Sequence, residues 1–386
     1  MAGHIFIIAG EASGDLLGSR LMKAIKAIDP TARFSGVGGN LMEEQGLKSL
    51  FPMEELALHG IVEVIRHIPG ILKRIDQVVG AVSSDKPDVL VTVDAPGFSL
   101  RVARKVKHLD VPLVHYVAPT VWAWKPRRAK KISRYLDHLL TLFDFEPPYF
   151  TKHGLRTTFV GHPLTESRVV FSRVESRVKL GIKDDDLVLV LLPGSRKSEI
   201  RRMLPFFQEV VQHFQERIPN LKTVLPVVDY VKDEVQELVS TWETKPMLIE
   251  QGESKDQAFA AADAALACSG TVSMELAWAK VPTIITYKMA MVSSLIGYTL
   301  LKVKYAGMIN IIADRMVQPE FLQWRCTLED VIASLEPLLL DKDARNAQIE
   351  ALSAITDRLR HPDRLPSEVA AEAVLEYVQN AGIRLR

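Results

Sequence analysis

The sequence predicts an α/β protein with two Rossmann-like, doubly wound domains that face a cleft. Short apolar runs rich in β-branched residues alternate with longer amphipathic patterns along the chain, which is typical of right-handed βαβ units and parallel sheets. A length of 386 residues exceeds what one ordinary core holds and fits two domains. A charged stretch without a strand pattern, 163–183, interrupts the alternation near the middle. We therefore predict one domain over 1–165, a second over 166–358 and a terminal helical segment over 359–386.

The predicted strands of the first half are short runs of Val, Ile, Leu, Phe and Thr that end at Gly, Pro or a polar residue. They cover 4–10, 33–39, 88–96, 112–119, 138–143 and 157–163. Amphipathic periodicity predicts helices between several of these strands, at about 14–28, 62–85, 97–109 and 126–135. Ligands of such sheets bind at the carboxyl ends of the strands, so the loops that follow the strands are where we expect the chemistry.

The second half repeats this style, with strands expected at 187–195, 222–228, 247–252, 264–270 and 282–287. Two helical segments close the chain, at about 328–358 and 366–380, and HPDRLP separates them. The last helix could dock on the first domain or on a neighbouring molecule, so a monomer and a homodimer both fit the pattern.

Composition excludes several classes of protein. The net charge of +1 argues against a general polyanion binder, although residues 1–165 hold 21 Lys/Arg against 16 Asp/Glu. Two cysteines, Cys268 and Cys326, are too few for a disulfide framework and lack metal-site spacing, which favours a reducing cytoplasm. No uninterrupted apolar run approaches the ~20 residues of a spanning helix. If the protein touches a membrane, we expect it to lie on the surface.

Two loops of the second half have the form expected of an anion site. In VLVLLPGSRKSEI (188–200), an apolar strand ends at Gly194 and Ser195 and delivers Arg196 to the start of a helix. Glycine allows close backbone approach, helix amides attract anions, and a guanidinium matches phosphate oxygens. Neither GxxxxGK[ST] nor GxGxxG occurs in the chain. An ordinary turn with a solvated arginine fits the same letters, so both interpretations stay open for this loop alone.

The second loop, ALACSGTVSMELA (264–276), has the same form, with Ser269, Gly270 and Thr271 at its turn. Ser269 or Thr271 could cap the helix, and Glu275 follows one turn later, where its carboxylate could accept hydrogen bonds from a ribose diol. Two anion loops and a diol acceptor in one domain indicate a nucleotide-diphosphate site. Alone, Glu275 would be an ordinary surface glutamate.

The loops of the first half carry acids instead. AGEASGD (9–15) offers Glu11 and Asp15, which would repel a phosphate and suit sugar hydroxyls or a proton. For Asp15, a place in the first helical turn is the better interpretation. Asp94 follows the buried run VLVTV, and burial would raise its pKa towards general-base range. A helix-capping Asp94 is a serious competitor.

A basic stretch with tryptophans follows. Residues 101–134 hold ten Lys/Arg and one acid, Asp110, and Trp122 and Trp124 lie just before the densest part. This composition fits a membrane–water boundary, nucleic-acid binding by stacking, or a solvated helix face. The segment HGIVEVIRHIPGILKRI (59–75) has basic flanks and could be a core helix or lie in a bilayer interface. Its apolar set includes Ile61, Val64, Ile65, Ile68 and Leu72.

Eight segments follow one another between about residues 4 and 325: AGEASGD, HGIVEV, DAPGF, HYVAPTVWAW, GHPL, LLPGSR, ACSGTVSMELA and NIIADRMVQPEFLQ. In these segments and their order, the chain resembles the lipid-A-disaccharide synthases, family-19 glycosyltransferases of the GT-B fold. This resemblance implies transfer from UDP-2,3-diacylglucosamine to 2,3-diacylglucosamine 1-phosphate, with formation of a β-1,6 disaccharide and release of UDP. It also implies peripheral association with the cytoplasmic leaflet of the inner membrane, and no nucleic acid, cofactor or metal.

The resemblance also assigns residues. Arg196 serves the diphosphate, and the element from Ser269 to Glu275 takes phosphate and ribose. On the same donor side lie Asn310, Glu320 and Gln323. For the acceptor hydroxyl, Asp94 is the best base candidate and Glu11 is also implicated. The family often reads DAPDFN where this chain has Gly97 and Ser99, so no second acid of that loop can take part.

Other functions compete with this one. Another GT-B enzyme, such as a UDP-sugar 2-epimerase or the peptidoglycan GlcNAc-transferase, would share the nucleotide loops. An epimerase needs no lipid surface, so the basic and Ile-rich stretches count against it. A non-catalytic nucleotide-sugar-binding or RNA-binding module would keep its ligand after Asp94→Ala, whereas a transferase would keep UDP and lose turnover.

Overall fold

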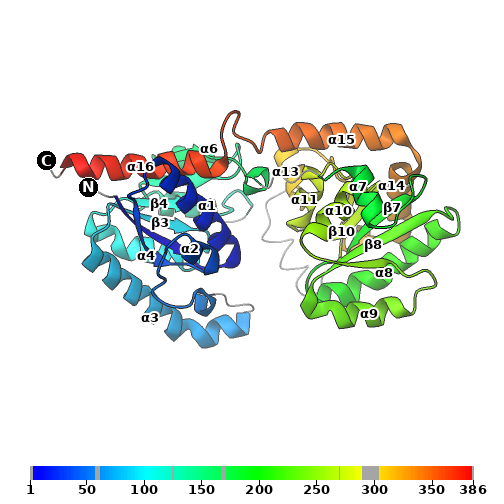
Figure 1. Ribbon diagram of the computed structural model, residues 1–386, viewed down its shortest axis with the longest axis horizontal. Coiled ribbons are helices and arrows are strands. Elements are labelled where there is room, and N and C mark those ends of the chain that lie inside the picture. The colour runs from blue at the N-terminus through cyan, green and yellow to red at the C-terminus, as the bar shows by residue number, and fades with distance from the viewer. Residues whose placement is uncertain are drawn as a thin grey trace. The chain divides into compact units, whose positions relative to one another are not determined.

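A computed structural model describes residues 3–56, 61–123, 126–166, 171–268, 270–288 and 304–384, with backbone only at 61–68 and 382–384. The chain forms two compact units (Figure 1). Unit 1 comprises Met1–Ser167 and Arg358–Arg386, and unit 2 comprises Arg168–Asp357. None of the helices in the described ranges combines the length and apolar character that crossing a membrane requires.

Unit 1 is built on a six-stranded sheet in the order β2-β1-β3-β4-β5-β6. Every neighbouring pair is parallel, as expected when helical crossovers link the strands. The strands are β1 (His4–Ala9), β2 (Arg33–Val37), β3 (Val89–Val93), β4 (Leu113–Tyr116), β5 (His138–Thr141) and β6 (Arg156–Phe159).

Helices cover both faces of this sheet. One core cluster joins the inward side chains of β1 and β3 to apolar residues of α3, α4 and α5. On the other side, α16 lies along α1, and both contact β3 (Figure 1). The helices are α1 (Ala12–Ile28), α2 (Asn40–Glu44), α3 (Ile61–Asp85), α4 (Ser99–Val106), α5 (Arg127–Ile132), α6 (Pro147–Thr151) and α16 (Pro366–Arg384).

The terminal helix α16 thus docks on the first unit of its own chain. Its buried face is small and apolar, with Ala370 and Val374 fully covered. Arg156 of β6 donates to Glu376 at 2.6 Å, and the amide of Ser367 donates to Glu166 at 2.6 Å. The sequence left two docking partners open for this helix, the first domain of its own chain and a neighbouring molecule. In this structure, α16 packs on the first domain.

Unit 2 contains a second six-stranded parallel sheet, in the order β12-β11-β10-β7-β8-β9. Its strands are β7 (Leu187–Leu192), β8 (Leu221–Val227), β9 (Met247–Glu250), β10 (Ala264–Cys268), β11 (Thr283–Tyr287) and β12 (Glu320–Leu322). Its helices are α7 (Arg173–Lys179), α8 (Lys197–Gln215), α9 (Lys232–Ser240), α10 (Glu253–Ala261), α11 (Val272–Trp278), α13 (Met308–Ala313), α14 (Leu328–Leu340) and α15 (Lys342–Asp357).

Strand β7 is apolar at every position because its side chains enter two different core clusters. Leu189 and Leu191 belong to a core cluster with α8, α9 and α14, whereas Val188 and Val190 belong to a cluster with α10 and α11. Because side chains alternate along a strand, a continuous apolar run fills both faces of a sheet that helices cover on each side.

Each sheet has a point where the strand order reverses. In unit 2, β7 is the first strand of its sheet along the chain, and it lies between β8 and β10. In unit 1, β1 lies between β2 and β3. Loops that leave such a point diverge to opposite faces and open a crevice at the carboxyl ends of the strands. Ligands are therefore expected to bind at the loops after β7 and β10 in unit 2, and at those after β1 and β3 in unit 1.

Candidate active site

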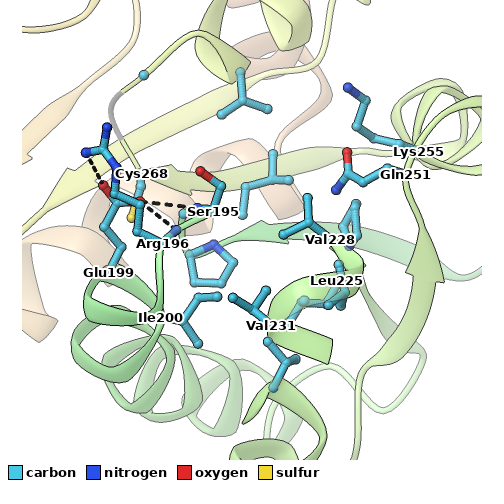
Figure 2. Close-up of a pocket in the computed structure, with 18 of the residues that line it drawn as sticks. Ser195, Arg196, Glu199, Ile200, Leu225, Val228, Val231, Gln251, Lys255 and Cys268 are labelled. Atoms are coloured by element: carbon cyan, nitrogen blue, oxygen red, sulfur yellow. Dashed lines mark hydrogen bonds and ion pairs between the residues drawn. The ribbon is translucent and has the colours of Figure 1, made fainter. Parts of the chain in front are cut away.

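The two predicted anion loops of unit 2 meet in one cavity. The loop after β7 and the loop after β10 flank the reversal point, and the cavity of about 390 Å³ between them is shown in Figure 2. Its lining includes Gly194, Ser195, Arg196, Gly270, Thr271 and Glu275, all of them assigned to this site from the sequence. The sequence thus predicted most of the polar wall, although 70 to 80 residues separate the two loops.

The turn after β7 depends on Gly194. Its φ of 110° is in the left-handed region, and a Cβ there would lie 2.5 Å from the Glu199 carboxylate. That carboxylate accepts hydrogen bonds from the amides of Ser195 at 3.2 Å and Arg196 at 3.3 Å. The sequence suggested that the amides of this turn are free to bind a phosphate. In the structure, two of them are bonded to Glu199, which closes the first turn of α8 as in a capping box.

Arg196 extends from this turn into solvent. Its side chain is 76% exposed, and Nη1 lies 3.4 Å from Glu199 Oε1. Tyr287 of β11 donates its hydroxyl to the same oxygen at 3.1 Å. Burial and the Glu199 carboxylate raise the pKa of Tyr287, so this phenol remains a hydrogen-bond donor at neutral pH. The guanidinium is thereby held at the mouth of the cavity while keeping donors for a ligand.

A lysine that the sequence analysis did not identify completes the cavity. Lys255 of α10 donates to Glu275 Oε2 at 2.6 Å, and both side chains are partly covered. In Figure 2, Lys255 and Gln251 lie on the opposite side of the cavity from Arg196. The cavity thus carries one cation on each side. Lys255 follows the end of β9, so its place after a strand was the signal that could have revealed it.

The remaining residues of the second loop differ in how far the structure describes them. Thr271 is the N-cap of α11, but its side chain makes no capping hydrogen bond. Gly270 is exposed and nothing crowds a Cβ there. Ser269 lies outside the described residues. Gly270 and Thr271 both line the cavity.

Three predicted donor-side residues do not line the cavity. Asn310 is fully buried, and its amide group makes four hydrogen bonds, to Gln318 O, Glu320 Oε1 and the amides of Val317 and Gln318. Glu320 also accepts from the amides of Ala306 and Gly307, at 2.7 and 3.2 Å. Asn310 therefore holds the Glu320 loop in place. The Gln323 side-chain nitrogen is buried and has no hydrogen-bond acceptor among the described residues.

In unit 1, Asp94 lies at the reversal point. It follows β3, and both Asp94 and Ala95 have left-handed backbone angles, with φ of 47° and 43°. Such a pair of non-glycine residues is strained, and strain of this kind gathers at functional sites. Burial raises the pKa of Asp94, while hydrogen bonds from the Ala95 amide and from Ser13 Oγ, at 3.4 Å, oppose the rise.

The neighbouring loop after β1 packs closely against Asp94's turn. A Cβ on Gly10 would lie 2.8 Å from the Ala95 side chain, so glycine is required for the approach. Glu11 is exposed at the N-cap of α1, without a side-chain capping bond. Asp15 is buried and accepts the amides of Gly39, Leu41 and Met42 at 2.8 to 3.1 Å. It caps α2, which gives it a structural role.

The predicted lipid-contact residues lie in different surroundings. Leu72 of α3 is 43% exposed. Trp122 is partly buried, packs edge-on against Phe145 at 5.5 Å and donates its indole N–H to Glu146 at 3.2 Å. The indole N–H, which would otherwise be able to donate to a lipid headgroup, therefore already has an acceptor inside unit 1. Outside the described residues or side chains lie Trp124, Ile61, Val64, Ile65 and Ile68.

The chain is similar over nearly its whole length to known proteins. The model of the family described as "Lipid-A-disaccharide synthetase" matches residues 5–374. A lipid-A-disaccharide synthase of Rhodospirillum centenum is 45% identical over 378 residues, which cover 97% of this chain and 94% of the relative. One of Paramagnetospirillum magneticum is 43% identical over 383 residues, which cover 97% of each chain.

Solved structures agree on the fold. The UDP-GlcNAc 2-epimerase of Neisseria meningitidis bound to UDP-GlcNAc has a TM-score of 0.60 at 11% identity, covering 97% of this chain and 99% of that one. MurG of Acinetobacter baumannii has a TM-score of 0.59 at 13% identity, covering 97% and 100%. At these identities the likeness shows the fold alone, which is GT-B as predicted.

The full-length relatives decide between the rival enzymes that the sequence left open. Their similarity covers both units, including the loops at both reversal points, whereas the epimerase and MurG share only the architecture. The chain therefore belongs to the lipid-A-disaccharide synthetase family, glycosyltransferases of lipid A biosynthesis.

Proposed function

We propose that the protein transfers 2,3-diacylglucosamine from its UDP derivative to the 6-hydroxyl of 2,3-diacylglucosamine 1-phosphate, with inversion to a β-1,6 linkage. The observation that carries this proposal is the meeting of the two glycine turns of unit 2 in one cavity at the strand reversal. A cavity of this kind, with a cation on each side, suits a nucleotide diphosphate.

On the donor side, the bond from the anomeric carbon to the UDP oxygen breaks, and negative charge gathers on the diphosphate. Arg196 and Lys255 supply positive charge for this leaving group, and the exposed turn at Gly270 and Thr271 supplies further donors. In this proposal Glu275 shares its carboxylate between Lys255 and the ribose hydroxyls. Charge stabilisation by preorganised donors needs no rearrangement at the moment of reaction, so it lowers the barrier.

On the acceptor side, a base removes the proton of the 6-hydroxyl as its oxygen attacks the anomeric carbon. Two carboxylates are available at the reversal point of unit 1, Asp94 and Glu11. The raised pKa of Asp94 supports it as the base, since a base whose pKa lies nearer the working pH accepts a proton more readily. Glu11 is exposed, and we assign it to the hydroxyls of the acceptor sugar.

Both substrates carry acyl chains, and we propose that the protein takes them from the cytoplasmic leaflet of the inner membrane as a peripheral protein. The exposed Leu72 and the basic residues of 101–134 support this. Arg74, one basic flank of α3, is bonded through two donors to Glu55 and lies over the Phe51 ring, so it contributes little charge to a lipid surface. The homodimer remains a prediction. Light scattering tests it, because it measures the molar mass of the protein in solution.

The test supplies UDP-2,3-diacylglucosamine and 2,3-diacylglucosamine 1-phosphate in neutral detergent and follows disaccharide and UDP. We expect both products in equal amounts from the wild type. Asp94→Asn should lower kcat at least a hundredfold while its affinity for UDP stays unchanged, because removal of a general base typically costs 10²–10⁴. Absence of disaccharide from folded wild-type protein would refute the proposed reaction.

A further inference from the structure

A second cavity of about 680 Å³ lies in unit 1 between α3, α4 and α5. Its floor is apolar, formed in part by Leu100, Ile132 and Tyr135, which are buried in the core of the unit. None of its lining residues is acidic. Its basic lining residues are Arg101, Arg104, Lys105, Arg127, Arg128 and Lys131.

Helical spacing brings these cations to the same place. Arg101 and Arg104 are three residues apart on α4, and Arg127 and Lys131 are four apart on α5, so each pair projects from one face of its helix. Arg104 of α4, Arg128 of α5 and Tyr135 line the same cavity. Burial raises the pKa of Tyr135, and the charges of the two arginines oppose that rise.

Most of this positive charge is uncompensated. Lys105 pairs with Asp76 of α3 at 2.5 Å. The other five cations have no carboxylate partner among the described side chains. Like charges held together repel one another, so an arrangement of five uncompensated cations around an apolar floor is favoured when an anion enters it.

The cavity reaches the loop that carries the proposed base. Pro96 and Gly97 line it, and they follow Asp94 directly in the turn after β3. Nothing lies within 4 Å of a Cβ built on Gly97, so this rim is open. A molecule with a hydroxyl at Asp94 could therefore extend along the same loop and place a second group in the cavity.

We propose that this cavity binds the phosphate of the acylated sugar acceptor, and that Arg104 and Arg128 determine the preference for a phosphorylated acceptor. This inference rests on the proposed function and assigns the acceptor's phosphate a site. A sugar 1-phosphate is a monoester that carries close to two negative charges at neutral pH, whereas the phosphodiester of a membrane phospholipid carries one. Several unpaired arginines match the monoester better, since arginine forks bind phosphate oxygens in pairs.

The test compares two acceptors, 2,3-diacylglucosamine 1-phosphate and 2,3-diacylglucosamine without the phosphate, in neutral detergent. The double variant Arg104→Gln/Arg128→Gln is measured beside the wild type. Lys130→Gln is the matched control, because Lys130 is an exposed cation of α5 that does not line the cavity. Thermal melting establishes that each variant is folded, and UDP affinity by calorimetry establishes that the donor cavity is intact.

We expect the double variant to raise KM for the phosphorylated acceptor at least tenfold and to lower the ratio of kcat/KM between the two acceptors at least tenfold. UDP affinity and the Lys130→Gln control should match the wild type. An unchanged KM, or an equal loss with both acceptors, would overturn the inference. So would a double variant that keeps its KM and loses only its binding to phosphatidylglycerol vesicles, which would assign the cavity to membrane phospholipid. If the wild type itself forms no disaccharide, the proposed function fails instead.

Discussion

Asp94 illustrates how one side chain receives opposing influences. Burial raises its pKa, and the hydrogen bonds from Ala95 and Ser13 lower it. As the proposed base, Asp94 must be ionised to accept a proton, so we expect activity to fall as the pH falls through its pKa, which lies above the ordinary value of 3.8. This fall in activity at low pH is the acid limb of the pH profile. The pH at which it occurs therefore reports the environment of Asp94.

Substitution Ser13→Ala removes a donor that favours the charged carboxylate. We expect the pKa of Asp94 to rise further, and the acid limb of kcat/KM to move to higher pH, with the plateau at high pH little changed. The pH profile of kcat/KM at fixed ionic strength measures this. A limb that stays in place, or moves to lower pH, would show that Asp94 is not the group that titrates.

Gly10 permits a close approach that any larger residue would prevent. In Gly10→Ala the new methyl group would lie 2.8 Å from the Ala95 side chain, so the strained turn that carries Asp94 must move. We expect kcat to fall about tenfold or more, since small displacements of a catalytic group are costly, with UDP affinity unchanged. Gly80→Ala is the control, because nothing lies within 4 Å of a Cβ there. Equal activity of the two variants would contradict this.

At the same scale, residue types in strand-end loops predicted most of the polar residues that line the cavity of unit 2, but not the hydrogen bonds between them. The motif letters of 193–196 suggested free amides, and the sequence does not reveal that Glu199 folds back onto them. Lys255 was missed although it follows a predicted strand, and its pairing with Glu275, twenty residues away, has no local signal. Such pairings depend on which strands become neighbours, and a single sequence does not specify that.

At the scale of elements, the loop after β5 carries a buried acid that ties two loops together. Glu146 is 2% exposed and accepts from Trp122 and from the amides of Leu142 and Phe143. Burial nevertheless raises its pKa to about 7, from an ordinary 4.5. Between these two pH values the folded protein holds a proton that the unfolded chain has lost, so stability decreases as the pH rises through this window.

The variant Glu146→Gln removes this titration. We expect the wild type to lose stability relative to the variant between pH 5 and pH 8, by on the order of 2–3 kcal/mol, and to change little above pH 8. Glutamine cannot satisfy all three donors, so the variant can be less stable at every pH. The informative quantity is how the difference in stability between the two proteins changes with pH, which thermal melting measures. A constant difference between the proteins would contradict the raised pKa.

Strands and helices with strong periodicity agreed with the sequence prediction. The alternation of apolar and amphipathic segments predicted eleven strands, and each lies in one of the two sheets. Strand β12 was not predicted; it has three residues and forms the edge of its sheet beside β11. A segment this short has no period of its own. Asn310 donates to Gln318 O and to Glu320 at the start of β12, and these bonds connect the strand to α13.

At the scale of the whole molecule, both units have the same arrangement, a parallel sheet with polar loops at the point where the strand order reverses. Each unit places its polar loops at the reversal of strand order, with cations in unit 2 and carboxylates in unit 1. A glycosyl transfer needs positive charge at the leaving group and a base at the attacking hydroxyl, and the proposed function assigns one of these tasks to each unit. Because each unit has its own core, variants at one site should leave binding at the other unchanged.

We propose that the cavity between the turns of Gly194 and Gly270 binds a uridine diphosphate, and the rest of the mechanism depends on this binding. Isothermal calorimetry of UDP tests it most directly, with wild-type protein, Arg196→Ala, Lys255→Ala and Asp94→Asn. We predict a single site in the wild type, affinity at least tenfold weaker in Arg196→Ala and Lys255→Ala, and wild-type affinity in Asp94→Asn. No heat from folded wild-type protein, or wild-type affinity in both cation variants, would contradict the account.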